Sequence, residues 1–255
     1  MTTNPFKQPK PGPPTVIIYG QGGIGKTTLG AHMPSPVFLQ PEEGLKSGQK
    51  VDASGLIKSY KDMVGMIDWL ITAEHKYQTV VLDGIDSIEK LIREDICSVG
   101  VKTLADFPYG KGYELFKNEW ERLTDKLTLL NQKKKMIILL LGHSKISRVE
   151  IPGSDPYDQN SIEIDKRGFG KLFNWADIVL FLSYRVSIIQ QEGSFGNIKT
   201  KALGDGSRIL YTSERPAYKA KNRYSFPHEI EVEDGAPENF WPEMKKLILA
   251  AGNKG

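Results

Sequence analysis

Apolar and polar positions follow two patterns that alternate along most of the chain. Runs that are apolar throughout are typical of strands buried on both faces of a sheet, and they occupy residues 15–19, 37–40, 79–82, 136–141 and 178–182. Apolar residues at helical spacing predict helices at 26–32, 60–74, 85–99, 112–131 and 242–251. Strands that alternate with helices predict an α/β fold with a mostly parallel sheet flanked by helices.

The pattern changes after Tyr184, where short strand-like runs at 186–190, 196–200 and 207–212 are separated by glycine-rich turns. This arrangement predicts a C-terminal antiparallel extension, a meander at one end of the main sheet. Residues 144–169 show no clear pattern, and a loop of that length in a compact domain is usually functional. Residues 1–14 are polar and rich in proline, so we expect a flexible tail followed by one domain at 15–255.

Composition places the chain among ordinary globular proteins, with 39% hydrophobic and 25% charged residues. No apolar run is long enough for a membrane helix, and residues 1–14 lack the apolar core of a signal peptide, so we expect no membrane contact. Cys97 is the single cysteine, which excludes an intrachain disulfide and favours a cytoplasmic setting. The net charge of +3 permits nucleic-acid binding without indicating it.

One segment carries a specific chemical motif. It matches the pattern G-x-x-x-x-G-K-[ST], and it lies between a predicted strand and a predicted helix. Glycines allow the backbone N–H groups to face an anion, and the helix N-terminus adds a positive dipole end. We therefore expect ATP to bind at Gly20, Gln21, Gly22, Gly23, Ile24, Gly25, Lys26, Thr27 and Thr28. Lys26 would reach the β- and γ-phosphates, and Thr27 would ligate Mg²⁺.

A second motif completes the expected Mg²⁺ site. The apolar strand 79–82 is followed by Asp83, whose carboxylate would order water on the ion. Asp86 is expected to cap the next helix. Gly84 stands where ATPases of the AAA+ and DExx helicase kind place a catalytic Glu, so a base for hydrolysis must come from elsewhere in the chain.

The order of several short segments resembles the RecA-like ATP-binding family common in bacteriophages, which includes the Sak-type single-strand-annealing proteins. The segments are Gly20–Thr28, Glu42-Glu43-Gly44, Leu82-Asp83, Gly142-His143, Asn174-Trp175-Ala176-Asp177 and Lys221-Asn222-Arg223. The resemblance spans residues from about 15 to 230. It implies a RecA-like P-loop core.

The resemblance also implies roles for two polar positions at strand ends. Glu42 or Glu43 would polarise the attacking water, with Glu42 the stronger candidate, although a solvated acidic turn is the alternative. His143 would sense the γ-phosphate and pass the nucleotide state to the following loop. The alternative for His143 is a histidine that caps a strand.

The segment 219–224 resembles the Lys-Asn-Arg-Phe-Gly motif of bacterial RadA. In that family the cations reach the γ-phosphate of a neighbouring subunit, as an arginine finger does. The resemblance therefore implies that Lys221 and Arg223 are catalytic and that the protein is a homo-oligomer with ATP at its subunit interfaces. A basic run is otherwise a solvated face.

RecA-like recombinases contact single-stranded DNA through loops that match residues 100–112 and 144–168 here. Cations that follow phosphates and aromatics that stack on bases suit such a groove, and these segments supply Lys102, Phe107, Tyr109, Lys111, Lys145, Arg148, Tyr157, Lys166 and Arg167, with Phe169 just beyond. Five acidic residues in the second segment weaken the case, and a mobile lid or subunit contact is the alternative.

Two functional hypotheses follow. In the first, the protein is an ATPase that acts on single-stranded DNA in phage-type recombination or annealing. In the second, it is an ATP-switched partner-binding protein, such as a loader or recruiter of a replication factor, with little DNA affinity. DNA-stimulated turnover distinguishes the two.

Overall fold

The computed structural model describes residues 12–45, 49–153, 155–185, 187–192, 198–203 and 206–252. Its strands are β1 (Thr15–Gly20), β2 (Pro36–Gln40), β3 (Asp52–Leu56), β4 (Thr79–Asp83), β5 (Ile137–Val149), β6 (Tyr157–Ile162), β7 (Ile178–Tyr184), β8 (Ser187–Glu192), β9 (Ile198–Leu203), β10 (Arg208–Tyr211), β11 (Lys221–Asn222) and β12 (Glu229–Val232). Its α-helices are α1 (Lys26–Ala31), α2 (Tyr60–Thr72), α3 (Ile85–Cys97), α4 (Lys111–Lys134), α5 (Lys166–Trp175) and α6 (Phe240–Gly252). Three short 3-10 turns are η1 (Leu104–Asp106), η2 (Pro108–Gly110) and η3 (Pro237–Asn239).

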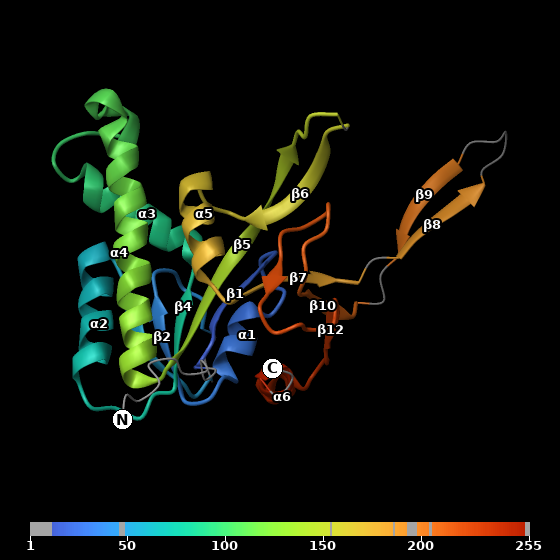
Figure 1. Ribbon diagram of the computed structural model, residues 1–255, viewed down its shortest axis with the longest axis horizontal. Coiled ribbons are helices and arrows are strands. Elements are labelled where there is room, and N and C mark those ends of the chain that lie inside the picture. Colours follow the sequence, from blue (N-terminus) through green and yellow to red (C-terminus); the bar gives the residue numbers. More distant parts are fainter. Residues whose placement is uncertain are drawn as a thin grey trace, which may run out of the picture.

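The main sheet has the strand order β12-β10-β7-β1-β5-β4-β2-β3 (Figure 1). The strands from β7 to β3 are parallel, whereas β10 and β12 are antiparallel to their neighbours. An α/β fold with a mostly parallel sheet and a C-terminal antiparallel extension is therefore confirmed. The last residue of β1, Gly20, lies opposite His143 on one side and Leu182 on the other, so the segments that leave these strands start close together.

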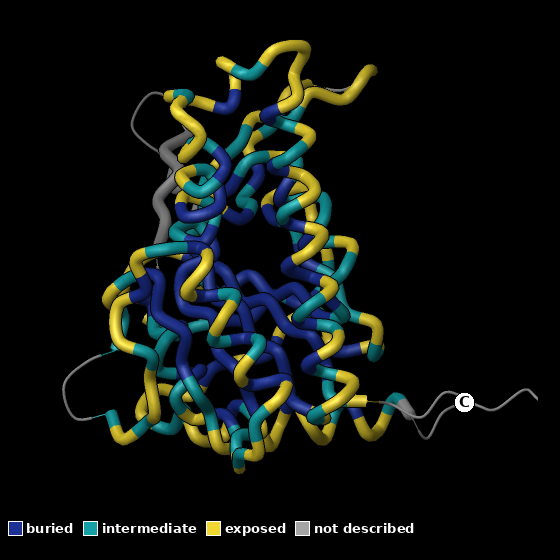
Figure 2. Tube along the Cα trace, turned by 90° about the vertical axis from the view of Figure 1, so that its left-hand side faces the viewer, coloured by how far each residue is buried: buried dark blue, intermediate teal, exposed yellow. Residues whose placement is uncertain are grey.

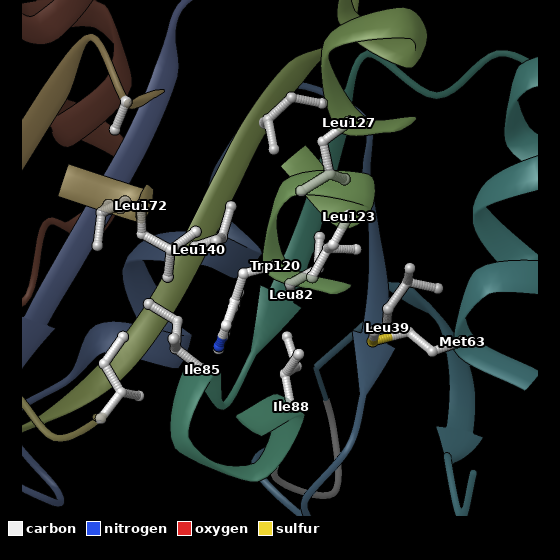
Figure 3. Close-up of a cluster of buried hydrophobic side chains, with 14 of the residues drawn as sticks. Leu39, Met63, Leu82, Ile85, Ile88, Trp120, Leu123, Leu127, Leu140 and Leu172 are labelled. Atoms are coloured by element: carbon white, nitrogen blue, oxygen red, sulfur yellow. The ribbon is translucent and has the colours of Figure 1, made fainter. Parts of the chain in front are cut away.

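Helices cover both faces of this sheet, and the buried residues lie between the layers (Figure 2). Alternate strand residues point to opposite faces, so Ile17 and Tyr19 join the core under α2, α3, α4 and α5, while Val16 and Ile18 join the core under α1 and α6. Figure 3 shows the first of these cores around Trp120 of α4. The site-bearing strand ends are thus held between two packed layers.

The long segment 144–169 was predicted to lack structure, and this prediction was wrong. β5 continues to Val149 and pairs with β6 as an antiparallel hairpin, after which α5 begins with Asp165 as its N-cap. The outer half of the hairpin has few buried side chains, so backbone pairing forms it without an apolar pattern that sequence reasoning could detect.

Two further elements differ from the prediction. β3 was not predicted, because this edge strand has almost no buried side chain. The expected meander is divided: β10 joins the main sheet, whereas β8 and β9 pair only with each other among the described strands. Val186 and the start of the second expected strand lie outside the described residues, as do residues 1–11 of the predicted tail. Within the described part of the chain, none of the helices has the length and apolarity that crossing a membrane requires.

Candidate nucleotide-binding site

The loop between β1 and α1 has the shape of a phosphate cradle. Gly23 and Gly25 have φ angles of 76° and 105°, which L side chains rarely adopt. A Cβ on Gly20 would lie 2.3 Å from the Leu182 carbonyl oxygen, so this position requires glycine for close approach to β7. Lys26 Nζ donates to the carbonyl oxygens of Gly20 and Gln21, both at 2.9 Å. The predicted strand, loop and helix order is confirmed, and the loop is closed by its own lysine.

The Lys26 side chain lies beneath the loop and is 7% exposed. Burial lowers its pKa, while the nearby carboxylates of Asp83, Asp86 and Glu42 act in the opposite direction. The ammonium group therefore lies near three carboxyl groups, which come from the end of β4, from the segment after β2 and from α3. The phosphates of a bound nucleotide would bring further negative charge close to this ammonium group.

Thr27 and Asp83 lie together at the start of α1 and the end of β4. Burial raises the pKa of Asp83, and the hydrogen bond that it accepts from Thr27 opposes the shift. Asp83 Oδ2 is buried without a hydrogen-bond partner. A Cβ on Gly44 would lie 2.5 Å from this oxygen and 3.5 Å from Thr27 Oγ1, so Gly44 leaves the space between the two groups open. A hydroxyl, a carboxylate oxygen in need of a partner and a small cradle fit Mg²⁺.

Glu42 reaches the same place from the segment that follows β2. Its Oε2 accepts a hydrogen bond of 2.7 Å from Ser87 Oγ of α3. A Cβ on Gly84 would lie 2.8 Å from Glu42 Cδ, so the Glu42 carboxyl group occupies the space that a side chain at position 84 would need. The glutamate missing beside Asp83 in the sequence is thus replaced in space by Glu42. Glu43 is exposed.

His143 comes from β5, directly opposite Gly20. Its Nδ1 lies 3.2 Å from both carboxylate oxygens of Asp86. The prediction that Asp86 caps α3 was wrong, because Gly84 is the N-cap residue and makes no side-chain cap bond. Sequence reasoning missed this His–Asp pair, since the two residues are far apart in the chain and meet only where β5 and α3 pack together.

These groups line one cavity of about 430 Å³, formed by Gly23, Gly25, Lys26, Thr27, Thr28, Glu42, Glu43, Gly44, Gln49, Asp83 and His143. The structure therefore brings together the phosphate loop, the two expected Mg²⁺ ligands, both candidate bases and the expected sensor. Such a polar cavity at the carboxyl ends of parallel strands is where open α/β sheets bind ligands.

Arg208 of β10 was not predicted to take part in the site. Its Nη1 donates to the Ile24 carbonyl oxygen at 3.2 Å, and its Nε and Nη2 contact Asp234 Oδ1 at 2.9 and 2.8 Å. A Cβ on Gly25 would lie 2.5 Å from Arg208 Nη1. The antiparallel extension therefore braces the outer side of the phosphate loop. No motif marks Arg208, because its position depends on the pairing of β10 with β7.

Lys221 and Arg223 lie away from this cavity. β11 pairs with Val179 and Ile178 at the start of β7, whereas the phosphate loop lies beside Leu182, about 10 Å further along the strand. Arg223 Nη1 lies 3.1 Å from Asp177 Oδ1, and both cations donate to the Asn174 carbonyl oxygen. Burial lowers the pKa of Lys221, and Arg223 adds to the effect. The structure does not bring these two cations to the chain's own phosphate loop.

The second predicted DNA segment reaches the start of α4: the Arg167 guanidinium lies 4.1 Å from the ring centre of Tyr113, the residue that follows the first segment. Several expected contact groups are already engaged within the chain. Lys145 Nζ donates to the Ile164 carbonyl oxygen, Arg148 pairs with Asp158 at 3.5 Å, and Phe169 stacks on Phe173. Lys102, Tyr109, Lys111 and Lys166 are exposed.

The site thus defines a P-loop nucleotide-binding protein, and the comparisons with known proteins add a family. Residues 13–224 match the family described as AAA domain, and the chain belongs to it. A curated relative, the SPbeta prophage-derived uncharacterized protein YorG of Bacillus subtilis (strain 168), is 25% identical over 175 residues. The match covers 66% of this chain and 50% of that protein, so the chain spans about half the length of the relative.

Two solved structures are similar to this chain in the path of the backbone. A RadB recombinase structure has 12% identity and a TM-score of 0.47, covering 87% of this chain and 89% of that one. The flagellar accessory protein FlaH from Methanocaldococcus jannaschii has 10% identity and a TM-score of 0.35, covering 88% and 91%. At these scores neither likeness bears on the activity of this chain.

We expect Arg208→Ala to weaken nucleotide binding about tenfold, because a hydrogen bond from a charged group that holds the phosphate loop is lost. The measurement is the dissociation constant of a fluorescent ATP analogue. Arg185→Ala is the control, since Arg185 directly follows β7, the neighbour of β10, and pairs only loosely, at 3.8 and 4.0 Å, with Glu229 and Glu231. Equal affinity of the two variants would show that the brace has no effect on binding.

Proposed function

We propose that this chain is a Mg²⁺-dependent ATPase of the RecA-like, Sak-type single-strand-annealing kind, which acts on single-stranded DNA in phage-type recombination in the cytoplasm. The observation that carries the proposal is the single cavity that gathers Lys26, Thr27, Asp83, Glu42 and His143. The prophage origin in the name of the curated relative supports the phage setting. We assign the activity to residues 15–255.

The chemistry we propose is in-line attack of water on the γ-phosphorus of ATP. Mg²⁺ held by Thr27 and Asp83 would neutralise charge on the phosphate oxygens. Glu42 accepts a proton from the water as the new P–O bond forms, and the bond to the ADP oxygen breaks. Ser87 holds Glu42 Oε2, so Oε1 is the oxygen left for the water. Lys26 would stabilise the negative charge that develops on the β-phosphate oxygen of the departing ADP.

His143 is placed to connect this chemistry to the hairpin of β5 and β6. Its carbonyl oxygen accepts a hydrogen bond of 2.9 Å from Glu163 N, and the next residue, Ser144, pairs with Ile162 as the first pair of the hairpin. A movement of His143 toward or away from a γ-phosphate would therefore shift the base of the hairpin directly. This supports a sensor role for His143.

Exposed groups on neighbouring segments support contact with a nucleic-acid strand. Tyr109 is fully exposed at the tip before α4, with Lys102 and Lys111 on the same segment and Lys166 at the start of the adjoining α5. Cations and an exposed ring are what sequence-tolerant binding of a single strand requires.

The second candidate function is the ATP-switched partner-binding protein, a loader or recruiter of a replication factor. One observation favours it. Lys145, Arg148 and Arg167, three cations of the second segment, are each held by groups of the same chain. Fewer free cations on the hairpin and at the start of α5 would suit a protein partner better than DNA.

The test is ATP turnover with and without single-stranded DNA at two salt concentrations, with Lys26→Ala as the blank. We expect stimulation that fades as salt rises, because released counterions contribute to DNA binding. Replacing Lys102, Lys111 and Lys166 together by Ala should remove most of the stimulation and flatten the salt dependence.

The control replaces Lys133, Lys245 and Lys246 by Ala, which removes the same charge from exposed positions near the far end of α4 and on α6 (Figure 1). Equal loss in both triple variants would indicate a general charge effect. Turnover that ignores DNA in the unaltered protein would favour the partner-binding switch.

A further inference from the structure

Asp86 is not the N-cap residue of α3, and its carboxylate is directed toward His143 of the nucleotide site. It lies in the first turn of α3, which begins at Gly84 without a side-chain cap. Both of its carboxylate oxygens lie 3.2 Å from His143 Nδ1. The two side chains are 25% and 34% exposed, so the pair is partly shielded from water.

The packing of α3 against β5 fixes this pair. Ile85 and Ile88 of α3 are fully buried in the core under the sheet (Figure 3). Gly142, which precedes His143, permits the close approach, because a Cβ there would lie 3.1 Å from Ile85 Cδ1. The start of α3 is therefore packed closely against β5 next to His143. Asp86 therefore contacts the His143 imidazole from a helix whose position is fixed by this packing.

The contact also decides which ring nitrogen faces the phosphate loop. A carboxylate only accepts hydrogen bonds, so His143 Nδ1 must be the donor to Asp86. His143 Nε2 is the other nitrogen, and a Cβ on Gly22 would lie 4.0 Å from it. Nε2 is thus presented to the loop. Carboxylates that hold a histidine in this way fix its ring orientation and tautomer.

We infer that Asp86 is a positioning residue of the nucleotide site, which holds the His143 ring so that Nε2 meets the terminal phosphate of the bound nucleotide. The inference rests on the proposed function. It also gives α3 a double role: Asp86 positions His143, and the next residue, Ser87, positions Glu42 through its hydroxyl. One helix start therefore places both side chains that would distinguish ATP from ADP.

The test compares Asp86→Ala and Asp86→Asn with the control Glu94→Gln, which removes a carboxylate from an exposed position on the same helix. We expect Asp86→Ala to lower kcat about 10- to 100-fold, by analogy with metal-binding histidines, for which loss of the hydrogen-bonding partner has an effect of this size. KM for ATP should change by less than about threefold, because the phosphate loop is intact. Asp86→Asn keeps an acceptor oxygen and should lose less activity than Asp86→Ala.

Two readouts do not depend on turnover. The ¹⁵N chemical shifts of the His143 ring should change in Asp86→Ala and stay unchanged in Glu94→Gln, since they report which nitrogen carries the proton. The ratio of the dissociation constants of ADP and ATPγS should fall toward one in Asp86→Ala. Unchanged ring shifts together with an unchanged ratio would overturn the inference, whatever the value of kcat.

These readouts separate the two proposals. If the unaltered protein does not hydrolyse ATP, the proposed ATPase function fails, while the ring shifts and the affinity ratio still decide the role of Asp86. If the protein hydrolyses ATP and Asp86→Ala keeps kcat within about twofold of the parent, the function stands and the inference about Asp86 is contradicted.

Discussion

Glu42→Gln should abolish ATP turnover while leaving nucleotide binding in place. The expected fall in kcat is about 10²- to 10⁴-fold, the usual contribution of a positioned general base. Glutamine has nearly the same shape, so the contact with Ser87 and the space over Gly84 can be kept while the proton acceptor is lost. The measurement is steady-state phosphate release, together with the dissociation constant of a fluorescent ATP analogue.

Glu43→Gln is the matched control, because Glu43 is the neighbouring carboxylate and also lines the cavity but is exposed. It should reduce kcat by less than about threefold, as expected for a screened surface charge. A large loss in Glu43→Gln with little loss in Glu42→Gln would make Glu43, and not Glu42, the general base. Full activity in both variants would show that neither Glu42 nor Glu43 is the general base.

The fold could be predicted wherever burial leaves a pattern in the sequence. The central strands, such as 79–82 and 136–141, are apolar throughout because both faces are covered by helices. The edge strand β3 and the outer part of the β5–β6 hairpin bury few side chains. Their hydrogen bonds are made by the backbone, which every sequence possesses, so no apolar pattern indicated them.

Some residues of the candidate site could likewise be predicted from the sequence, and others could not. Lys26, Asp83 and His143 lie at or shortly beyond the predicted apolar strand runs, so they could be placed together from the sequence, because carboxyl ends of parallel strands meet at one edge. Asp86 and Arg208 could not. Asp86 depends on the packing of α3 against β5, and Arg208 depends on the register of an antiparallel strand. Neither contact leaves a local signal.

Arg223→Ala should reduce ATP turnover about 10³-fold or more while nucleotide affinity stays unchanged, as expected when an arginine finger is lost. The cation lies near the start of β7, away from its own phosphate loop, so we propose that it acts in the site of a neighbouring copy. Its contact with Asp177 is exposed, and its loss should leave the melting temperature nearly unchanged. Lys221→Ala should likewise lower ATP turnover and leave nucleotide affinity unchanged.

Mixing inactive variants tests the intersubunit role directly. In an assembly with head-to-tail contacts, each site combines the phosphate loop of one copy with Arg223 of the next. Equal amounts of Lys26→Ala and Arg223→Ala subunits would then give intact sites at about a quarter of the interfaces, one half times one half. Turnover should return to a corresponding fraction of the parent value.

Lys26→Ala mixed with Glu42→Gln is the control, because both defects lie on the copy that supplies the phosphate loop and no interface becomes intact. Recovery in the first mixture alone would place Arg223 in the neighbour's site. If neither mixture recovers although subunits exchange, Arg223 acts within its own chain. Its contacts with Asp177 and the Asn174 carbonyl would then be its function, bracing the start of β7 against the end of α5.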